Sequence, residues 1–164
     1  MAARKPTAAE MTVLLLFHAT LSGAFLVAYL TGDEDTYGMH VFSGCAVLAA
    51  LALRAATGVL ARTGSPLRFP RPAVQPLRDW LARLLTGDAG ARAERSPLVA
   101  WMAAALLAGV ALAAGTGAVA DFVGPVEDLH EALGEAALYV VLAHVAVVFG
   151  LHWLKRRTPA PRPA

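Results

Sequence analysis

Four histidines that lie inside strongly apolar stretches are the side chains of this chain best suited to chemistry: His18, His40, His130 and His144. An imidazole can bind a metal through a ring nitrogen, exchange a proton near neutral pH, or hydrogen-bond a neighbouring group. His130 and His144 are 14 residues apart, which in a helix corresponds to roughly 21 Å of rise and nearly four full turns. Both rings therefore leave one helix from nearly the same face, at two depths.

The elements that position these histidines are predicted to be membrane spans. Of the 164 residues 57% are hydrophobic and only 16% are charged, a composition too apolar for an ordinary soluble domain of this length. A span needs about 20 apolar residues, and four segments qualify: 11–31, 39–61, 98–119 and 126–154. We therefore expect residues 1–164 to form a single all-α transmembrane domain, a four-helix bundle in the membrane.

The loop between the second and third spans contains one further helical pattern. From Pro76 to Thr86 the apolar side chains follow helical spacing, and Gly87 is expected to end the helix. The apolar positions are Leu77, Trp80, Leu81, Leu84 and Leu85. An amphipathic helix of this kind is predicted to lie flat on the inner membrane surface.

The distribution of charge predicts the topology. Apart from Arg54, the basic residues belong to the N-terminus, the middle loop and the C-terminus: Arg4, Lys5, the seven arginines from Arg62 to Arg95, Lys155, Arg156, Arg157 and Arg162. The other two connections carry only acidic charges: Asp33, Glu34, Asp35, Asp121, Glu127 and Asp128. By the positive-inside rule both termini and the middle loop are expected in the cytoplasm. Topology and anionic lipid explain the basic loop without nucleic-acid binding.

Depth in the membrane sorts the histidines into two predicted pairs. His18 lies about 13 Å inside the cytoplasmic end of the first span, and His144 lies at a similar depth in the last span. His40 and His130 each stand near the outer end of their spans. An ionisable residue inside a span is by default a hypothesis of function. The alternative is that each histidine only hydrogen-bonds a neighbouring helix.

The number of ligands at each level favours haem over a bare metal ion. Structural zinc usually takes four protein ligands, and two imidazoles are too few. Haem iron needs only two axial ligands, because the porphyrin supplies the other four nitrogens. Cys45 is the only cysteine, which excludes a covalent C-x-x-C-H haem. The spacing therefore predicts two b haems, with a non-redox scaffold or a metal or proton carrier as the alternative.

Three further residues share faces with the histidines. Gly44 follows His40 by four residues, and Gly134 follows His130 by four, so each glycine leaves space beside an imidazole. That space suits a flat macrocycle, although glycines also permit close helix packing. Arg54 stands 14 residues after His40, at the depth of the cytoplasmic pair. It is expected either to offset a haem propionate or to extend towards the cytoplasmic interface.

Taken together, these motifs resemble the bacterial cytochrome b561 and nickel-hydrogenase b-type cytochrome family over nearly the whole chain. They are Phe17-His18, Thr31-Gly32, His40 through Gly44, Leu53-Arg54, Gly58, Leu67-Arg68-Phe69, Ser96-Pro97, Leu129 through Gly134, and Ala143-His144. The chain departs from the family pattern at Ala19, Ser96 and Glu135, none of which is a histidine. The resemblance implies a four-helix bundle in which His18 and His144 hold a cytoplasmic haem and His40 and His130 hold an outer haem.

The resemblance also implies transmembrane electron transfer in a bacterial cytoplasmic membrane, as part of a respiratory chain. The expected partners are membrane lipid, a diffusible quinone, and a redox protein such as a c-type cytochrome or a hydrogenase. The sequence leaves open whether the chain is a complete quinone-linked oxidoreductase or the membrane subunit of one. It also leaves the oligomeric state open.

Overall fold

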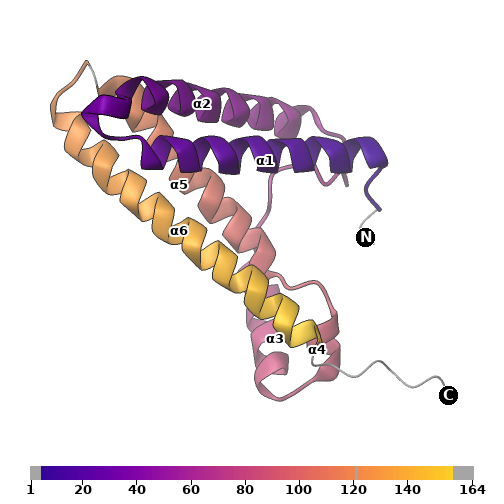
Figure 1. The fold of residues 1–164 in the computed structure, drawn as a ribbon. Coiled ribbons are helices and arrows are strands. Elements are labelled where there is room, and N and C mark those ends of the chain that lie inside the picture. The colour runs from indigo at the N-terminus through magenta and orange to yellow at the C-terminus, as the bar shows by residue number, and fades with distance from the viewer. Residues whose placement is uncertain (1–4, 121, 157–164) are drawn as a thin grey trace. The chain divides into compact units, whose positions relative to one another are not determined.

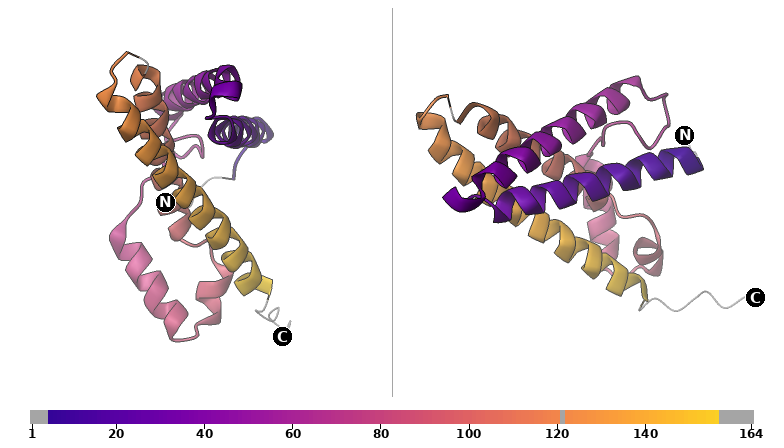
Figure 2. Two further views of the ribbon diagram at one scale, coloured as in Figure 1. Left: turned by 60° about the vertical axis from the view of Figure 1, so that its left-hand side comes forward. Right: turned by 45° about the horizontal axis from the view of Figure 1, so that its top comes forward.

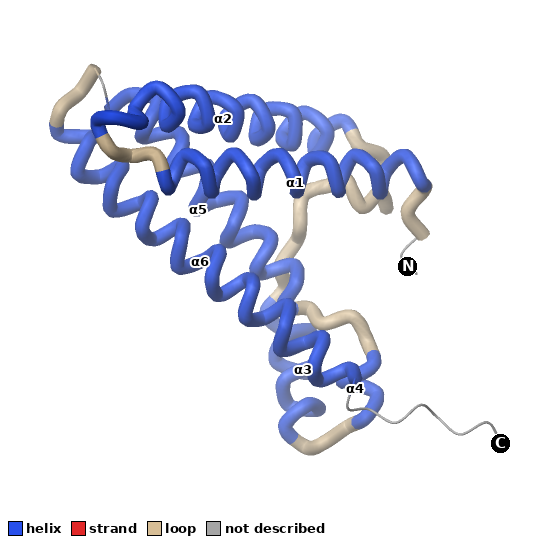
Figure 3. The backbone as a smooth tube through the Cα atoms, in the orientation of Figure 1, coloured by secondary structure: helices blue, strands red, loops and turns tan. Residues whose placement is uncertain are grey.

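The computed structural model describes residues 5–120 and 122–156, and all of their regular structure is helical (Figures 1 and 3). Arg4, Asp121, Arg157 and Arg162, which contribute to the charge argument, lie outside the described residues. The long helices are α1 (Ala8–Leu30), α2 (Tyr37–Leu60), α5 (Leu98–Ala120) and α6 (Pro125–Arg156). Each is long and apolar enough to cross a membrane. The predicted all-α fold with four candidate spans is therefore confirmed.

The ends of the long helices lie within three residues of the predicted spans, and the largest difference is the start of α1, three residues earlier than predicted. α1 begins in a capping box, in which the Glu10 backbone N–H donates to Thr7 Oγ1 at 3.2 Å and the Thr7 N–H donates to Glu10 Oε2 at 2.8 Å. Such reciprocal bonds satisfy donors that the first helical turn leaves open. A single turn of 3₁₀ helix, η1 (Glu34–Thr36), then connects α1 to α2.

The chain forms two compact units, which we describe separately. Unit 1 comprises Met1–Phe69 and Leu107–Ala137, and unit 2 comprises Pro70–Leu106 and Leu138–Ala164. In unit 1, α1 and α2 form an antiparallel pair, and both views of Figure 2 show them side by side. The buried apolar residues of unit 1 are small or medium-sized: Val47, Ala50, Val110, Ala113 and Ala137. Most of its large apolar side chains point outwards, as is expected where lipid replaces water as the solvent.

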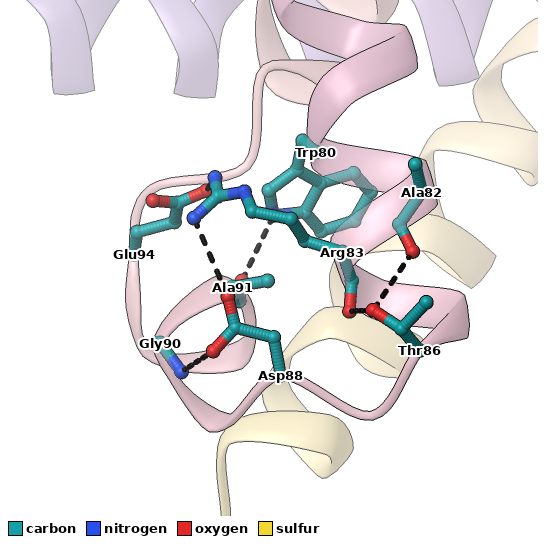
Figure 4. Close-up of polar contacts among 8 residues, drawn as sticks. All are labelled: Trp80, Ala82, Arg83, Thr86, Asp88, Gly90, Ala91 and Glu94. Atoms are coloured by element: carbon teal, nitrogen blue, oxygen red, sulfur yellow. Dashed lines mark hydrogen bonds and ion pairs between the residues drawn. The ribbon is translucent and has the colours of Figure 1, made fainter.

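Unit 2 contains the amphipathic helix, α3 (Val74–Leu85), together with a short helix that the sequence pattern did not predict, α4 (Ala89–Ala93). Gly87, at a φ of +81°, lies just after the end of α3, a conformation that glycine adopts without strain. Asp88 caps α4 by accepting from the Gly90 N–H at 2.8 Å. Trp80 is only 3% exposed, and its indole N–H donates to the Ala91 carbonyl at 2.8 Å (Figure 4).

Trp80 is therefore expected to hold α4 against α3. Trp80→Phe keeps an aromatic ring but leaves the Ala91 carbonyl without its donor, which should cost about 0.5–1.5 kcal/mol of local stability. Limited trypsin digestion of the purified protein should then cut faster after Arg83 and Arg92. Trp101→Phe is the matched control, because the Trp101 N–H reaches the Ala73 carbonyl only at 3.4 Å. Equal cleavage of the Trp80 variant and the unaltered protein would contradict this role.

Candidate functional site

His40 and His130, which depth predicts to be partners, face each other in unit 1. His40 lies in the first turn of α2 and His130 in the second turn of α6. Their ring centroids are 5.8 Å apart and the ring planes make an angle of 70°. Both side chains are half-buried. The structure thus brings together two imidazoles from helices that are far apart in the sequence.

The ring of His40 is held by the end of α1. Its Nδ1 lies 2.8 Å from the Ala28 carbonyl oxygen. Ala28 belongs to the last turn of α1, where its carbonyl accepts a long bond of 3.4 Å from the Thr31 N–H and can accept a second bond from a side chain. The tight connection through η1 returns the chain so that His40 reaches this carbonyl. The Tyr37 ring also stacks on His40, with the centroids 6.3 Å apart.

The ring of His130 is held by α5. Its Nδ1 lies 2.9 Å from the Ala113 carbonyl oxygen and 3.5 Å from Thr116 Oγ1. Gly117 provides the space for the ring, because a Cβ at that position would lie 2.7 Å from His130 Cε1 and 3.2 Å from Nε2. Gly117 follows Ala113 by one helical turn, so its missing side chain also leaves the Ala113 carbonyl accessible.

His40 and His130 each contact a carbonyl of a neighbouring helix, as the alternative in the sequence analysis expects of the histidines. The contacts also indicate the tautomer of both rings. A carbonyl oxygen can only accept a hydrogen bond, so each Nδ1 carries the proton. In the neutral imidazole Nε2 then keeps its lone pair and can bind a metal. An Nδ1–H donated to a backbone carbonyl is the usual outer contact of a metal-bound histidine, since it fixes the ring orientation and raises the basicity of the ligand.

The separation of the rings fits one metal ion between them. Imidazole nitrogen binds first-row metals at about 2.0 Å, so two rings that share an ion have centroids roughly 6 Å apart. The observed 5.8 Å agrees with this. Within residues 5–120 and 122–156, no group of three or more histidine, cysteine, aspartate or glutamate side chains could hold a metal. A metal bound at this level would have the two imidazoles as its protein ligands among the described residues.

Gly44 and Gly134 lie beside the histidine pair without contacting another helix. A Cβ at either position would meet no atom within 4 Å. Gly58 differs, because its Cβ would lie 2.8 Å from the Phe69 ring. The space at Gly44 and Gly134 is open, as it also is at Gly23, Gly38 and Gly115. The role of the two glycines beside a flat ligand stays a prediction.

Arg54 makes contacts that neither sequence hypothesis included. It is buried in unit 1, where Nη1 donates to the Leu67 carbonyl at 2.6 Å and Nη2 donates to the Arg68 carbonyl at 3.2 Å. The guanidinium carbon also lies 5.8 Å from the Phe17 ring centroid and 5.3 Å from that of Phe69, within the range of cation–π attraction. Arg54 thus fastens the loop after α2 onto α1 and α2.

His18 and His144 belong to different units, His18 to unit 1 and His144 to unit 2. The backbone carbonyl of His18 accepts from Ser22 Oγ at 2.7 Å. The pairing of these two histidines stays a prediction from depth and from the family resemblance.

The third span contributes more than its sequence suggested. α5 carries none of the histidines, yet its residues Ala113 and Gly117 position His130. A Cβ at Gly109, one turn before Ala113, would lie 3.9 Å from the Ala137 Cα of α6. These three residues recur every four positions on one face of α5. Small residues at this spacing are typical of closely packed membrane helices, and this signal was present in the sequence.

Comparison of the chain with protein-family models, with curated proteins and with solved structures finds no match. The resemblance to the b-type cytochromes is carried by short motifs in the sequence. It stays a prediction.

The role of Gly117 can be tested against a neighbouring glycine. Gly117→Ala should destabilise the protein by about 1–3 kcal/mol, the usual cost of an added methyl group in a filled space. Gly115→Ala is the control, because nothing lies within 4 Å of its Cβ position and alanine is favoured over glycine in a helix by about 0.5–1 kcal/mol. Thermal denaturation in detergent should show the two variants shifting in opposite directions. A Gly117 variant as stable as the Gly115 variant would show that the His130 ring has room to move.

Proposed function

We propose that this chain is a dihaem b-type cytochrome that transfers electrons across a membrane. The observation that carries the proposal is the His40–His130 pair, in which the ring centroids are 5.8 Å apart in an edge-to-face arrangement and both Nδ1 atoms contact backbone carbonyls. In this proposal His40 and His130 are axial ligands of an outer haem. His18 and His144 are the ligands of a second haem on the cytoplasmic side.

The residues at the outer level fit a haem better than another metal group. A bound haem supplies one-electron chemistry at an iron that needs two axial ligands from the protein. Two neutral imidazoles meet this need, whereas zinc would need further ligands and the described residues offer no such cluster. The open space beside Gly44 and Gly134 suits the plane of a porphyrin.

Spectroscopy separates the non-redox alternative from the haem proposal. The carbonyl contacts hold both rings through Nδ1 and leave Nε2 with a lone pair, which can bind iron or accept a proton. A carrier without haem would show no b-type absorption band.

The four candidate spans make the chain a multi-pass membrane protein. We further propose that it lies in a bacterial cytoplasmic membrane with both termini inside, as the charge distribution predicts. The His40–His130 pair is then near the outer surface, and the predicted His18–His144 pair is near the cytoplasm. Electrons would pass between a quinone in the membrane and a redox protein, for which a c-type cytochrome and a hydrogenase are the candidates.

Acidic side chains lie on α6 at about the height of His130, on another side of the helix. Asp128, Glu131 and Glu135 line a shallow depression on α6, on the same helix as His130. Negative charge near a haem stabilises the ferric state and lowers its reduction potential. We therefore expect the outer haem to have a lower potential than it would have with neutral residues at these positions.

Substitution of the ligands should separate the two haems. His40→Ala and His130→Ala should each remove the outer haem and spare the inner one, and His18→Ala and His144→Ala should do the reverse. His152→Ala, on the exposed fifth histidine, should keep both. The measurements are the haem-to-protein ratio and the reduced-minus-oxidised spectrum of the purified variants. Absence of a b-type band in the unaltered protein would refute the proposed function, and loss of the inner haem in the His40 variant would refute the pairing.

Two roles of Arg54, holding the loop after α2 and offsetting the charge of a haem propionate, can be measured separately. If its charge also offsets a propionate of the inner haem, Arg54→Leu should lower the midpoint potential of that haem, because a lost positive charge favours the ferric state. Arg54→Lys keeps the charge and should keep the potential. Both variants lose the paired bonds to the Leu67 and Arg68 carbonyls, so trypsin should cut faster after Arg68 in both. If the potential of the Leu variant is unmoved or raised while cleavage is faster, Arg54 fastens the loop and has no propionate role.

A further inference from the structure

The exposed side chains of α3 are sorted by polarity. Val74, Leu81 and Leu85 are 50%, 41% and 87% exposed, and on a helix of 3.6 residues per turn they fall along one edge. We call this edge the α3 apolar edge. Gln75, Asp79 and Thr86 lie on another side of the helix and are also exposed, with Gln75 Nε2 donating to Asp79 Oδ1 at 2.8 Å. Exposed apolar and polar residues thus occupy separate strips.

α4 fixes the rotation of α3 through Trp80. The Trp80 ring is buried and bonds the Ala91 carbonyl, so it does not serve as a membrane anchor. On the polar side Arg83 pairs with Asp88 at 3.6 Å and also with Glu94, both from the chain that follows α3 (Figure 4). With these contacts in place, α3 cannot rotate to bury its apolar edge against α4.

The position of α3 in the chain indicates what covers this edge. α2 and α5 are consecutive spans, so the segment between them starts and ends at the same membrane surface. Charge supports the same conclusion. Between residues 70 and 97 the chain has five arginines against three acidic residues, namely Arg71, Arg78, Arg83, Arg92 and Arg95 against Asp79, Asp88 and Glu94. A basic amphipathic segment beside a span attracts anionic lipid headgroups.

We propose that the α3 apolar edge inserts into the interface of an anionic membrane leaflet, with Arg78 beside it at the level of the lipid phosphates. Lipid is favoured over a protein partner because the edge consists of only three side chains. A stable protein interface needs about 800 Å² from each partner, much more than such an edge provides. This surface is independent of the haem proposal, since it requires only that the long helices span a membrane.

The test uses single cysteines on α3 in the full-length protein. Cys45, the only native cysteine, is first replaced by serine. Leu81→Cys and Leu85→Cys then report on the apolar edge, and Gln75→Cys and Asp79→Cys are matched controls on the polar side of the same helix. Each is labelled with an environment-sensitive fluorophore and reconstituted into vesicles of phosphatidylglycerol and phosphatidylcholine. Quenching is measured with aqueous iodide and with lipids that carry a nitroxide on the acyl chain.

The expected result is a blue-shifted emission at positions 81 and 85, with iodide quenching several-fold weaker and lipid quenching several-fold stronger than at positions 75 and 79. Arg78→Gln, or vesicles of phosphatidylcholine alone, should reduce the difference. Equal iodide quenching at all four positions would overturn the proposal, because the edge would then face water. Protection from iodide without lipid quenching would also overturn it, since a protein surface would then cover the edge.

Discussion

The hydrogen bonds between imidazole Nδ1 atoms and backbone carbonyls are the contacts on which the site depends. A polar ring among apolar helices is costly unless it finds a partner, and few side chains in these spans could provide one. Backbone carbonyls fill this role: Ala28 at the end of α1 for His40, and Ala113 within α5 for His130. The first is available because a carbonyl in the last turn of a helix can accept a bond from a side chain. The second is available because Gly117 has no side chain to cover it.

Gly58 and Gly117 differ from Gly44 and Gly134 in what surrounds them. Gly58 and Gly117 are filled sites, because an added Cβ would contact Phe69 or His130 at less than 3.0 Å. Gly44 and Gly134 are open sites, with no atom within 4 Å, and several other glycines of unit 1 are open in the same way. The position of Gly44 and Gly134 one turn after the two histidines is therefore what agrees with the proposed haem, and their open space alone does not distinguish them.

The sequence predicted the parts of the structure that depend on long apolar runs. Hydrophobicity over about 20 residues identified the spans, and helical spacing identified α3, because these signals involve many residues at once. The His40–His130 contact was also predictable. Helices that span one membrane bring residues at equal distances from the same surface to the same depth, and both histidines lie near the outer ends of their spans. α4 was missed, because a five-residue helix depends on the Asp88 cap and on Trp80, not on periodicity. Arg54 was expected to contact a propionate or the interface, whereas its hydrogen bonds go to loop carbonyls that no pattern in the sequence indicates.

The role of α5 could have been predicted, because its small residues recur every four positions in the sequence. This helix explains how the two imidazoles come to the same height. The face formed by Gly109, Ala113 and Gly117 contacts α6 at Ala137 and at His130. Because the contacts run in opposite directions along the two helices, they fix the register of α6 against α5 in unit 1. A shift of α6 by one residue would move His130 by about 1.5 Å and turn it by about 100°, away from both the Ala113 carbonyl and His40. The small residues of a helix without any histidine thus set the geometry of the histidine pair.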